Sequence, residues 1–310
     1  MPTDLRVLLG RLSLRAPVLA AAGTVGYGLE FGQVRGLERL GALITKTLTR
    51  EPRDGARPPR LAETPSGMLN AVGLQNIGLE AFLEEKLPAL RALNVPMIVS
   101  LLGESPDELG QLCQRLETAS AVAAVEVNLS CPNVRHAGED PWAMVAHDPA
   151  ATEAFVRAAR RATTKPLLVK LSPDVTDIAP IARAAEQAGA DALTIANTYR
   201  AMRLDPSTRH SQLGALTGGL SGPAIRPLTL LRVYRAAQAV RCPIIGLGGI
   251  VRLEDALEYF LAGASAVAVG TAHFADPAAS VRLADALARY LARRRLETVR
   301  ALVGGLAEPS

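Results

Sequence analysis

The chain has 310 residues, of which 49% are hydrophobic and 21% are charged, a composition typical of a globular protein with one large core. No run approaches the roughly 18 apolar residues that a membrane helix requires, and charges interrupt the N-terminal leucines, so we expect a soluble, cytoplasmic protein without a signal peptide. The net charge is only +4 and the few aromatic residues are scattered, which argues against a nucleic-acid partner.

A short hairpin is expected first, where residues 5–9 and 11–14 flank Gly10, and it would plug one end of the fold. Short apolar, β-branched runs then recur along the chain, each typical of a strand that is buried on both faces. There are eight such runs, at residues 18–22, 42–46, 97–101, 124–128, 167–171, 192–197, 244–247 and 266–269.

Helical patterns lie between many of these runs. Residues 178–188 and 254–262 are examples, and Gly189 and Gly263 follow them as helix-stop residues. Strands that alternate with helices form a parallel sheet, and eight of them predict a (β/α)8 TIM barrel, here one domain over residues 1–310. A doubly wound sheet is the structural alternative.

Three connections are longer than a barrel usually has, at about residues 50–80, 129–148 and 198–222. In a (β/α)8 barrel the loops that follow the strands carry the active site. No low-complexity tract separates the chain into domains, so we interpret these segments as ordered insertions at the site.

Polar residues follow several predicted strands. Two of the four lysines, Lys46 and Lys170, and two of the six asparagines, Asn128 and Asn197, stand at strand ends. Because the carboxyl ends of all eight strands meet at one mouth, these side chains are predicted to share one site.

Glycines follow the last two predicted strands, at Gly248-Gly249 and Gly270-Thr271. Barrels commonly bind phosphate at this position through backbone N–H groups, and Gly218-Gly219 and Ser221-Gly222 would complete such a site. No GxGxxG follows a strand, so the pattern favours a phosphorylated cofactor over a dinucleotide on a Rossmann fold.

Cys131 lies between polar residues in the block Asn128-Leu129-Ser130-Cys131-Pro132-Asn133, where a thiol can act as a base or nucleophile. Cys113 and Cys242 lack such surroundings. Three cysteines far apart encode neither a disulfide framework nor a metal or cluster site, so we expect no metal on this chain. Catalysis by a Ser/His/Asp set is disfavoured because the four histidines lie away from the strand ends.

Three blocks together resemble the class 1 dihydroorotate dehydrogenases over about residues 5–290. They are the block around Cys131, the segment Gly67-Met68-Leu69-Asn70-Ala71-Val72-Gly73-Leu74-Gln75-Asn76, and the segment Thr217-Gly218-Gly219-Leu220-Ser221-Gly222-Pro223. The chain is most similar to the NAD-linked type (class 1B), whose catalytic chain works beside a partner that carries FAD and a [2Fe-2S] cluster.

The resemblance implies a barrel that holds one FMN at its C-terminal mouth and oxidises (S)-dihydroorotate to orotate in pyrimidine (UMP) biosynthesis. It assigns Cys131 as the base that takes a proton from C5 while hydride passes from C6 to flavin N5. Lys46, also catalytic, would bridge substrate and flavin. Lys170 would face the flavin pyrimidine ring, where a fixed positive charge stabilises the reduced anionic flavin.

The remaining site residues also follow from the resemblance. The substrate would contact Lys46, Asn70, Ala71, Val72, Gly73, Leu74, Asn128, Asn133, Asn197 and Thr198. FMN would contact Ala22, Lys46, Thr47, Ser100, Asn128, Lys170, Ala196, Gly222, Gly248, Gly249, Gly270 and Thr271. Two of these depart from the family pattern, since Ser100 replaces an Asn that often contacts flavin and Ala22 stands where many relatives have Ser.

Two hypotheses are open for the electron acceptor. The resemblance favours a homodimer that joins the FAD and iron–sulfur partner in a heterotetramer and passes electrons to NAD. The rival is a self-sufficient homodimer that reduces fumarate or another soluble acceptor. Two further alternatives are a Schiff-base aldolase that uses Lys170 and a flavin-binding subunit without catalysis.

Overall fold

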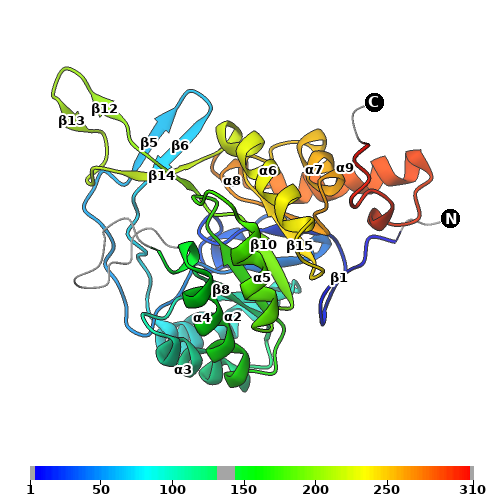
Figure 1. Ribbon diagram of the computed structural model, residues 1–310, viewed down its shortest axis with the longest axis horizontal. Coiled ribbons are helices and arrows are strands. Elements are labelled where there is room, and N and C mark those ends of the chain that lie inside the picture. Colours follow the sequence, from blue (N-terminus) through cyan, green and yellow to red (C-terminus); the bar gives the residue numbers. More distant parts are fainter. Residues whose placement is uncertain (1–3, 131–143, 308–310) are drawn as a thin grey trace.

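The computed structural model describes residues 4–130 and 144–307, and its centre is a closed barrel of eight parallel strands (Figure 1). This confirms the predicted (β/α)8 architecture. In spatial order the barrel strands are β10 (Ala192–Ile195), β15 (Ile244–Leu247), β16 (Ala266–Val269), β3 (Val18–Ala20), β4 (Ala42–Ile44), β7 (Met97–Leu101), β8 (Val122–Asn128) and β9 (Leu167–Leu171).

The predicted strands agree with the structure within two residues at each end. Strands β3, β4 and β10 stop two residues earlier than expected. Ala22, Lys46 and Asn197 therefore lie just beyond their strands, at the barrel mouth.

Helices cover the outside of the barrel. Ser105 caps α3 by accepting a hydrogen bond from the Glu108 amide at 3.2 Å, and Asp148 caps α4 by accepting one from the Ala150 amide at 2.9 Å. The helices are α1 (Leu79–Ala81), α2 (Leu87–Leu90), α3 (Pro106–Glu117), α4 (Pro149–Ala162), α5 (Ala179–Gln187), α6 (Arg226–Ala237), α7 (Leu253–Leu261), α8 (Ala272–Ala275) and α9 (Ala279–Arg294), with short 3-10 or π turns between some of them. Gly189 and Gly263 follow α5 and α7 with φ of 104° and 109°, as helix-stop residues should. No helix in the described ranges is both long and apolar enough to cross a membrane.

The predicted hairpin is present as β1 (Val7–Leu9) and β2 (Leu12–Leu14). Leu9, Leu12 and Leu14 are buried and belong to the same apolar cluster as the residues that fill the barrel interior. The hairpin therefore plugs the amino-terminal end of the barrel.

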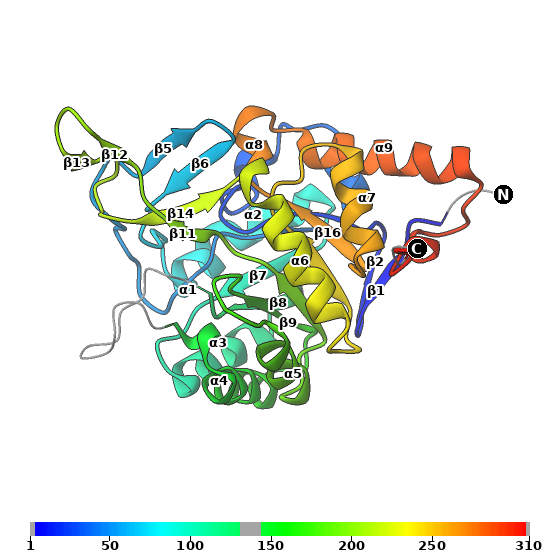
Figure 2. The same ribbon diagram turned by 45° about the horizontal axis from the view of Figure 1, so that its top comes forward.

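Two of the long insertions form a second sheet at the opposite end (Figure 2). The connection after β4 supplies β5 (Leu61–Thr64) and β6 (Gly67–Asn70), and the connection after β10 supplies β11 (Tyr199–Ala201) and β14 (Gly218–Ser221). Their antiparallel order is β11-β14-β6-β5, and a small hairpin of β12 (Leu204–Asp205) and β13 (His210–Ser211) extends beyond them. This sheet ties two distant loops into one wall.

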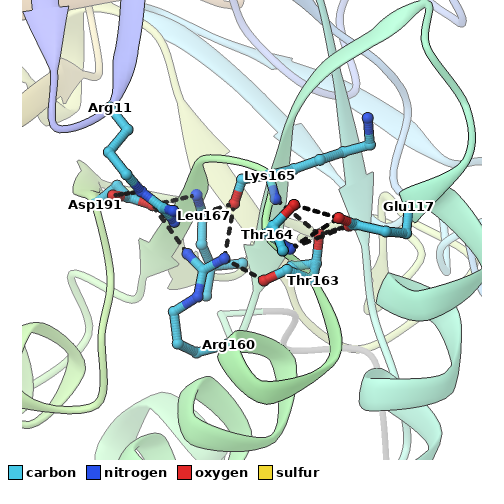
Figure 3. Close-up of polar contacts among 8 residues, drawn as sticks. All are labelled: Arg11, Glu117, Arg160, Thr163, Thr164, Lys165, Leu167 and Asp191. Carbon is cyan, nitrogen blue, oxygen red and sulfur yellow. Dashed lines mark hydrogen bonds and ion pairs between the residues drawn. The ribbon is translucent and has the colours of Figure 1, made fainter.

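An ionic cluster joins the hairpin to the barrel (Figure 3). Asp191 accepts hydrogen bonds from Arg11 Nε at 2.8 Å, Arg160 Nη1 at 3.0 Å and the Leu167 amide at 2.8 Å. Burial alone would raise the pKa of Asp191, but these donors and the two guanidinium charges outweigh it and lower the pKa. The carboxylate thus links the turn of the β1–β2 hairpin, α4 and β9.

His273, on α8, is buried between two hydroxyl groups. Its Nδ1 lies 3.3 Å from Thr24 Oγ1, its Nε2 lies 3.0 Å from Ser280 Oγ, and its ring packs edge-on against Phe31. Burial lowers the pKa of His273 to about 4, so the folded protein holds this ring neutral.

We expect Asp191→Asn to lower the free energy of unfolding by about 2 kcal/mol at pH 7, because it removes a carboxylate from several charge-assisted hydrogen bonds. Since the pKa of Asp191 is lowered in the folded state, its contribution is present above the unfolded pKa and is lost as pH falls through the folded pKa. Denaturant titration measures both effects. Glu80→Gln, which removes an exposed partner of Arg115, is the control and should cost less than about 1 kcal/mol. Equal losses in the two variants would contradict the role of Asp191.

A second prediction concerns His273→Gln. A histidine with a folded pKa of about 4 and an unfolded pKa of about 6.5 makes the protein lose stability as pH falls between those values. Between pH 7 and pH 5 the loss attributable to His273 is about 2 kcal/mol. From pH 7 to pH 5 the free energy of unfolding should therefore fall by about 2 kcal/mol more in the wild type than in the variant. Unfolding curves recorded at both pH values measure this difference. An equal fall in the two proteins would refute the assignment.

Candidate active site at the carboxyl ends of the barrel strands

A cavity of about 940 Å³ opens at the carboxyl ends of the barrel strands, beside the second sheet. Its size is within the range of roughly 300–1,000 Å³ that is usual for ligand and cofactor sites. Most of the described residues that the sequence placed in the site line it, namely Ala22, Lys46, Thr47, Asn70, Val72, Leu74, Asn128, Lys170, Ala196, Asn197, Thr198, Gly222, Gly248, Gly249, Gly270 and Thr271.

Two lysines enter this cavity from different strands. Lys46 follows β4 and is half-buried, and Lys170 lies within β9 with 5% of its surface exposed. Two ammonium groups at one cavity make the electrostatic potential there positive. The cavity is therefore suited to an anionic or electron-rich ligand.

A chain of hydrogen bonds orients the amide side chains of the cavity. Asn197 Nδ2 donates to Ser130 Oγ at 2.9 Å, and Ser130 Oγ donates to Asn128 Oδ1 at 3.0 Å. Asn128 Nδ2 donates to Thr47 Oγ1 at 3.0 Å, and Thr47 Oγ1 lies 2.9 Å from Ser100 Oγ. The protein thus hydrogen-bonds both the oxygen and the nitrogen of the Asn128 and Asn197 amides, with Asn197 Oδ1 accepting from the Thr198 amide at 2.8 Å, and this fixes the orientation of both side chains.

The second sheet supplies another amide. Asn70, at the end of β6, pairs in register with Gly219 of β14 and donates Nδ2 to the Gly219 carbonyl at 3.2 Å. A Cβ at position 219 would lie 2.0 Å from Thr198 Oγ1, so glycine is required for Thr198 to occupy this place. Asn70 and Thr198 therefore reach one cavity from two insertions.

Glycines form the part of the cavity nearest β15 and β16. Gly222, Gly248 and Gly249 have φ of 94°, 144° and 68°, and a Cβ on Gly249 would lie 2.8 Å from the Gly222 carbonyl oxygen. At Gly270, in contrast, a Cβ would meet nothing closer than 3.7 Å. These glycines line the cavity, and Tyr259 holds the backbone there by donating its hydroxyl to the Gly248 carbonyl at 2.7 Å.

Three predicted contacts do not line the cavity. Ser100 is fully buried, and its side chain turns toward Thr47. Ala71 packs in a small apolar cluster with Leu69, and Gly73 lies against Ala56, whose amide nitrogen would be 2.3 Å from an added Cβ.

Cys131 and Asn133 lie outside the described residues. The other two thiols are poor nucleophiles, because burial raises the pKa of Cys113 and of Cys242 to about 12.

Several residues that line the cavity were not predicted from the sequence. Thr24, Glu63, Arg252, Phe274, Arg282 and Arg289 also face the cavity. Arg282 and Arg289 stand seven residues apart on α9, a spacing that places them on one helix face. That spacing is the one signal in the sequence for this outer wall. Among the described residues, no three His, Cys, Asp or Glu side chains are grouped to hold a metal ion.

Comparison with known proteins places the chain in a family. The family model for dihydroorotate dehydrogenase matches residues 5–291. A protein of Trichlorobacter lovleyi and one of Pelobacter propionicus are each 49% identical to this chain over 306 residues, 99% of both chains. A protein of Geobacter sulfurreducens is 48% identical over 303 residues, 98% of both chains. Each relative bears the name dihydroorotate dehydrogenase B (NAD(+)), catalytic subunit. Like them, the chain belongs to the dihydroorotate dehydrogenase family of oxidoreductases.

Proposed function

We propose that this chain oxidises dihydroorotate to orotate in UMP biosynthesis, with FMN bound in the barrel-mouth cavity. The observation that carries the proposal is the convergence of Lys46, Lys170, Asn70, Asn128 and Asn197 on that one cavity. These cations and amides match a flat, anionic, amide-rich substrate and an electron-rich cofactor.

The glycine-rich part of the cavity fits the phosphate of FMN. Gly222, Gly248, Gly249 and Gly270 line this part of the cavity and offer backbone N–H groups, and Thr271 adds a hydroxyl. Lys170, on the floor, supplies a fixed positive charge, and Ala22, Thr47 and Ala196 complete the proposed cofactor contacts. When bound, FMN supplies the two-electron acceptor for the reaction.

The substrate contacts come from both halves of the cavity. The Lys46 ammonium neutralises the substrate carboxylate, and Asn70, Asn128 and Asn197 bind the ring amides in the orientations set by their own hydrogen bonds. Asn133, Thr198 and the segment 71–74 complete the set. Fixed donors and acceptors hold the reacting carbon in one orientation, which lowers the entropic cost of the reaction.

Cys131 removes the proton from C5 in this proposal. It directly follows Ser130, whose hydroxyl and carbonyl are held by Asn128 and Asn197. A thiol titrates close enough to neutral pH to act as a general base, unlike a serine hydroxyl.

Electrons leave through a partner in this proposal. The relatives are named as catalytic subunits of an NAD(+)-linked enzyme, which supports a separate electron-transfer subunit. We propose that it carries FAD and a [2Fe-2S] cluster and joins a homodimer of this chain. Copurification with such a subunit from the native cell would support this, and robust fumarate turnover by the isolated chain would overturn it.

An anaerobic visible spectrum of the purified chain, recorded before and after dihydroorotate is added, tests the central claim. Bleaching of a flavin band would show cofactor, substrate and electron transfer together. A yellow protein that does not bleach would refute the proposed substrate, and a colourless protein that cannot take up FMN would refute the proposed cofactor.

We expect Cys131→Ser to bind FMN and orotate normally but to reduce its flavin about 10²–10⁴-fold more slowly at pH 7, because it lacks a competent base. Stopped-flow measurement of a single turnover is the direct check. Wild-type reduction should accelerate as pH rises toward the thiol pKa, near 8.5 in a free cysteine. Near-normal reduction by the variant would eliminate Cys131 as the base.

Gly270→Ala should weaken FMN binding about tenfold or more with little change in melting temperature, because the added methyl enters the cavity and meets no protein atom closer than 3.7 Å. Gly110→Ala, within α3 and away from the cavity, is the matched control and should keep normal FMN affinity. Fluorescence titration of FMN measures both variants, and equal affinities would contradict the proposed placement of the cofactor.

A further inference from the structure

Glu126 is a charged residue in the middle of a barrel strand. It lies on β8 between Val125 and Val127, and its side chain is completely buried. A carboxylate at such a place is costly unless it has partners. The mechanism proposed above gives it no role.

The position of its carboxylate follows from the register of three strands. Glu126 Oε2 accepts a hydrogen bond from Thr194 Oγ1 at 3.0 Å, although β9 separates β8 from β10. This contact must therefore cross the inside of the barrel. Thr194 is paired with Lys170 on β9, and Glu126 is paired with Leu168. The Glu126 side chain thus rises from the level of Leu168 toward that of Lys170.

Among the described residues of the barrel strands, Glu126 and Lys170 are the two charged side chains that are buried. The pKa of Glu126 is raised overall because burial is the largest effect, and the Lys170 charge and the Thr194 and Ser100 hydroxyls offset part of that rise. Its Oε1 has no hydrogen bond of ordinary geometry. The pair is therefore placed for mutual compensation in a low-dielectric interior.

We propose that Glu126 is a positioning residue, whose carboxylate holds the Lys170 ammonium at the floor of the cavity and offsets part of its charge. The proposal rests on the proposed function in one respect, because Lys170 is the cation that we place against the cofactor. Glu126 itself acts through Lys170 and does not line the cavity.

The first test is the redox equilibrium of FMN-loaded protein with a reference dye. Glu126→Gln keeps the size of the side chain and removes its charge, so more of the Lys170 charge acts on the reduced anionic flavin. We expect the ratio of reduced to oxidised flavin to rise about tenfold at a fixed dye potential. An unchanged ratio would overturn the proposal.

Repeating the substitution in a Lys170→Met background shows whether Glu126 affects the flavin through Lys170 or independently of it. Without the ammonium, a buried carboxylate takes up a proton, and Gln then replaces a group that is already neutral. Adding Glu126→Gln to Lys170→Met should therefore change the flavin ratio by less than about twofold. The same tenfold change in both backgrounds would show that Glu126 does not act through Lys170.

Thermal unfolding of the FMN-free protein tests the pair without cofactor or substrate. Glu126→Gln and Lys170→Met each leave one buried charged group without its partner, whereas the double variant removes both charged groups. The melting temperature of the double variant should therefore fall by less than the sum of the falls in the two single variants. Additive losses would overturn the pairing whether or not the chain binds FMN, whereas failure of FMN binding with this coupling intact would count against the proposed function alone.

Discussion

Closure of eight parallel strands is the constraint on which the site depends. The carboxyl end of every strand must face the same way, so a residue at the end of β4 meets residues at the ends of β8, β9 and β10 although roughly 80 to 150 positions separate them. Below that mouth the interior is filled by apolar side chains and sealed by the β1–β2 hairpin. Polar groups that the strands carry at their ends are therefore concentrated in one cavity.

The polar side chains at the boundary between these two regions are partly buried, so they must find hydrogen-bond partners among themselves. A chain of hydrogen bonds joins Asn197, Ser130, Asn128, Thr47 and Ser100. Such a network is rigid because displacing one member leaves its neighbours unsatisfied in a low-dielectric site. The fold thus orients the amide side chains before any ligand arrives, which is what precise binding requires.

The barrel and most of the cavity lining were predictable from the sequence, because buried parallel strands are continuous apolar runs and their ends are easily recognised. The second sheet was not, since β6 and β14 are short, glycine-containing strands that pair across about 150 positions. Which side chains face the cavity was also not always predictable. Ser100 lies near a strand end, but its hydroxyl contacts Thr47 and does not line the cavity. Arg289 lines the cavity although it belongs to a helix of the outer layer. The local sequence pattern is enough to predict the strands, whereas the direction of a side chain near a loop depends on the residues that the fold brings into contact with it.

Ser100 lies between the polar residues at the floor of the cavity and the charged pair beneath it, because it bonds to Thr47 and is the register partner of Glu126 on the neighbouring strand. Thr47 Oγ1 accepts a hydrogen bond from Asn128, so its own proton is available to Ser100 Oγ, and the Ser100 hydroxyl lowers the pKa of the neighbouring Glu126. The groups proposed to bind substrate are thus joined by hydrogen bonds as far as Ser100, and the carboxylate proposed to tune the cofactor lies on the adjacent residue of the next strand. A change in either set therefore alters the electrostatic surroundings of the other.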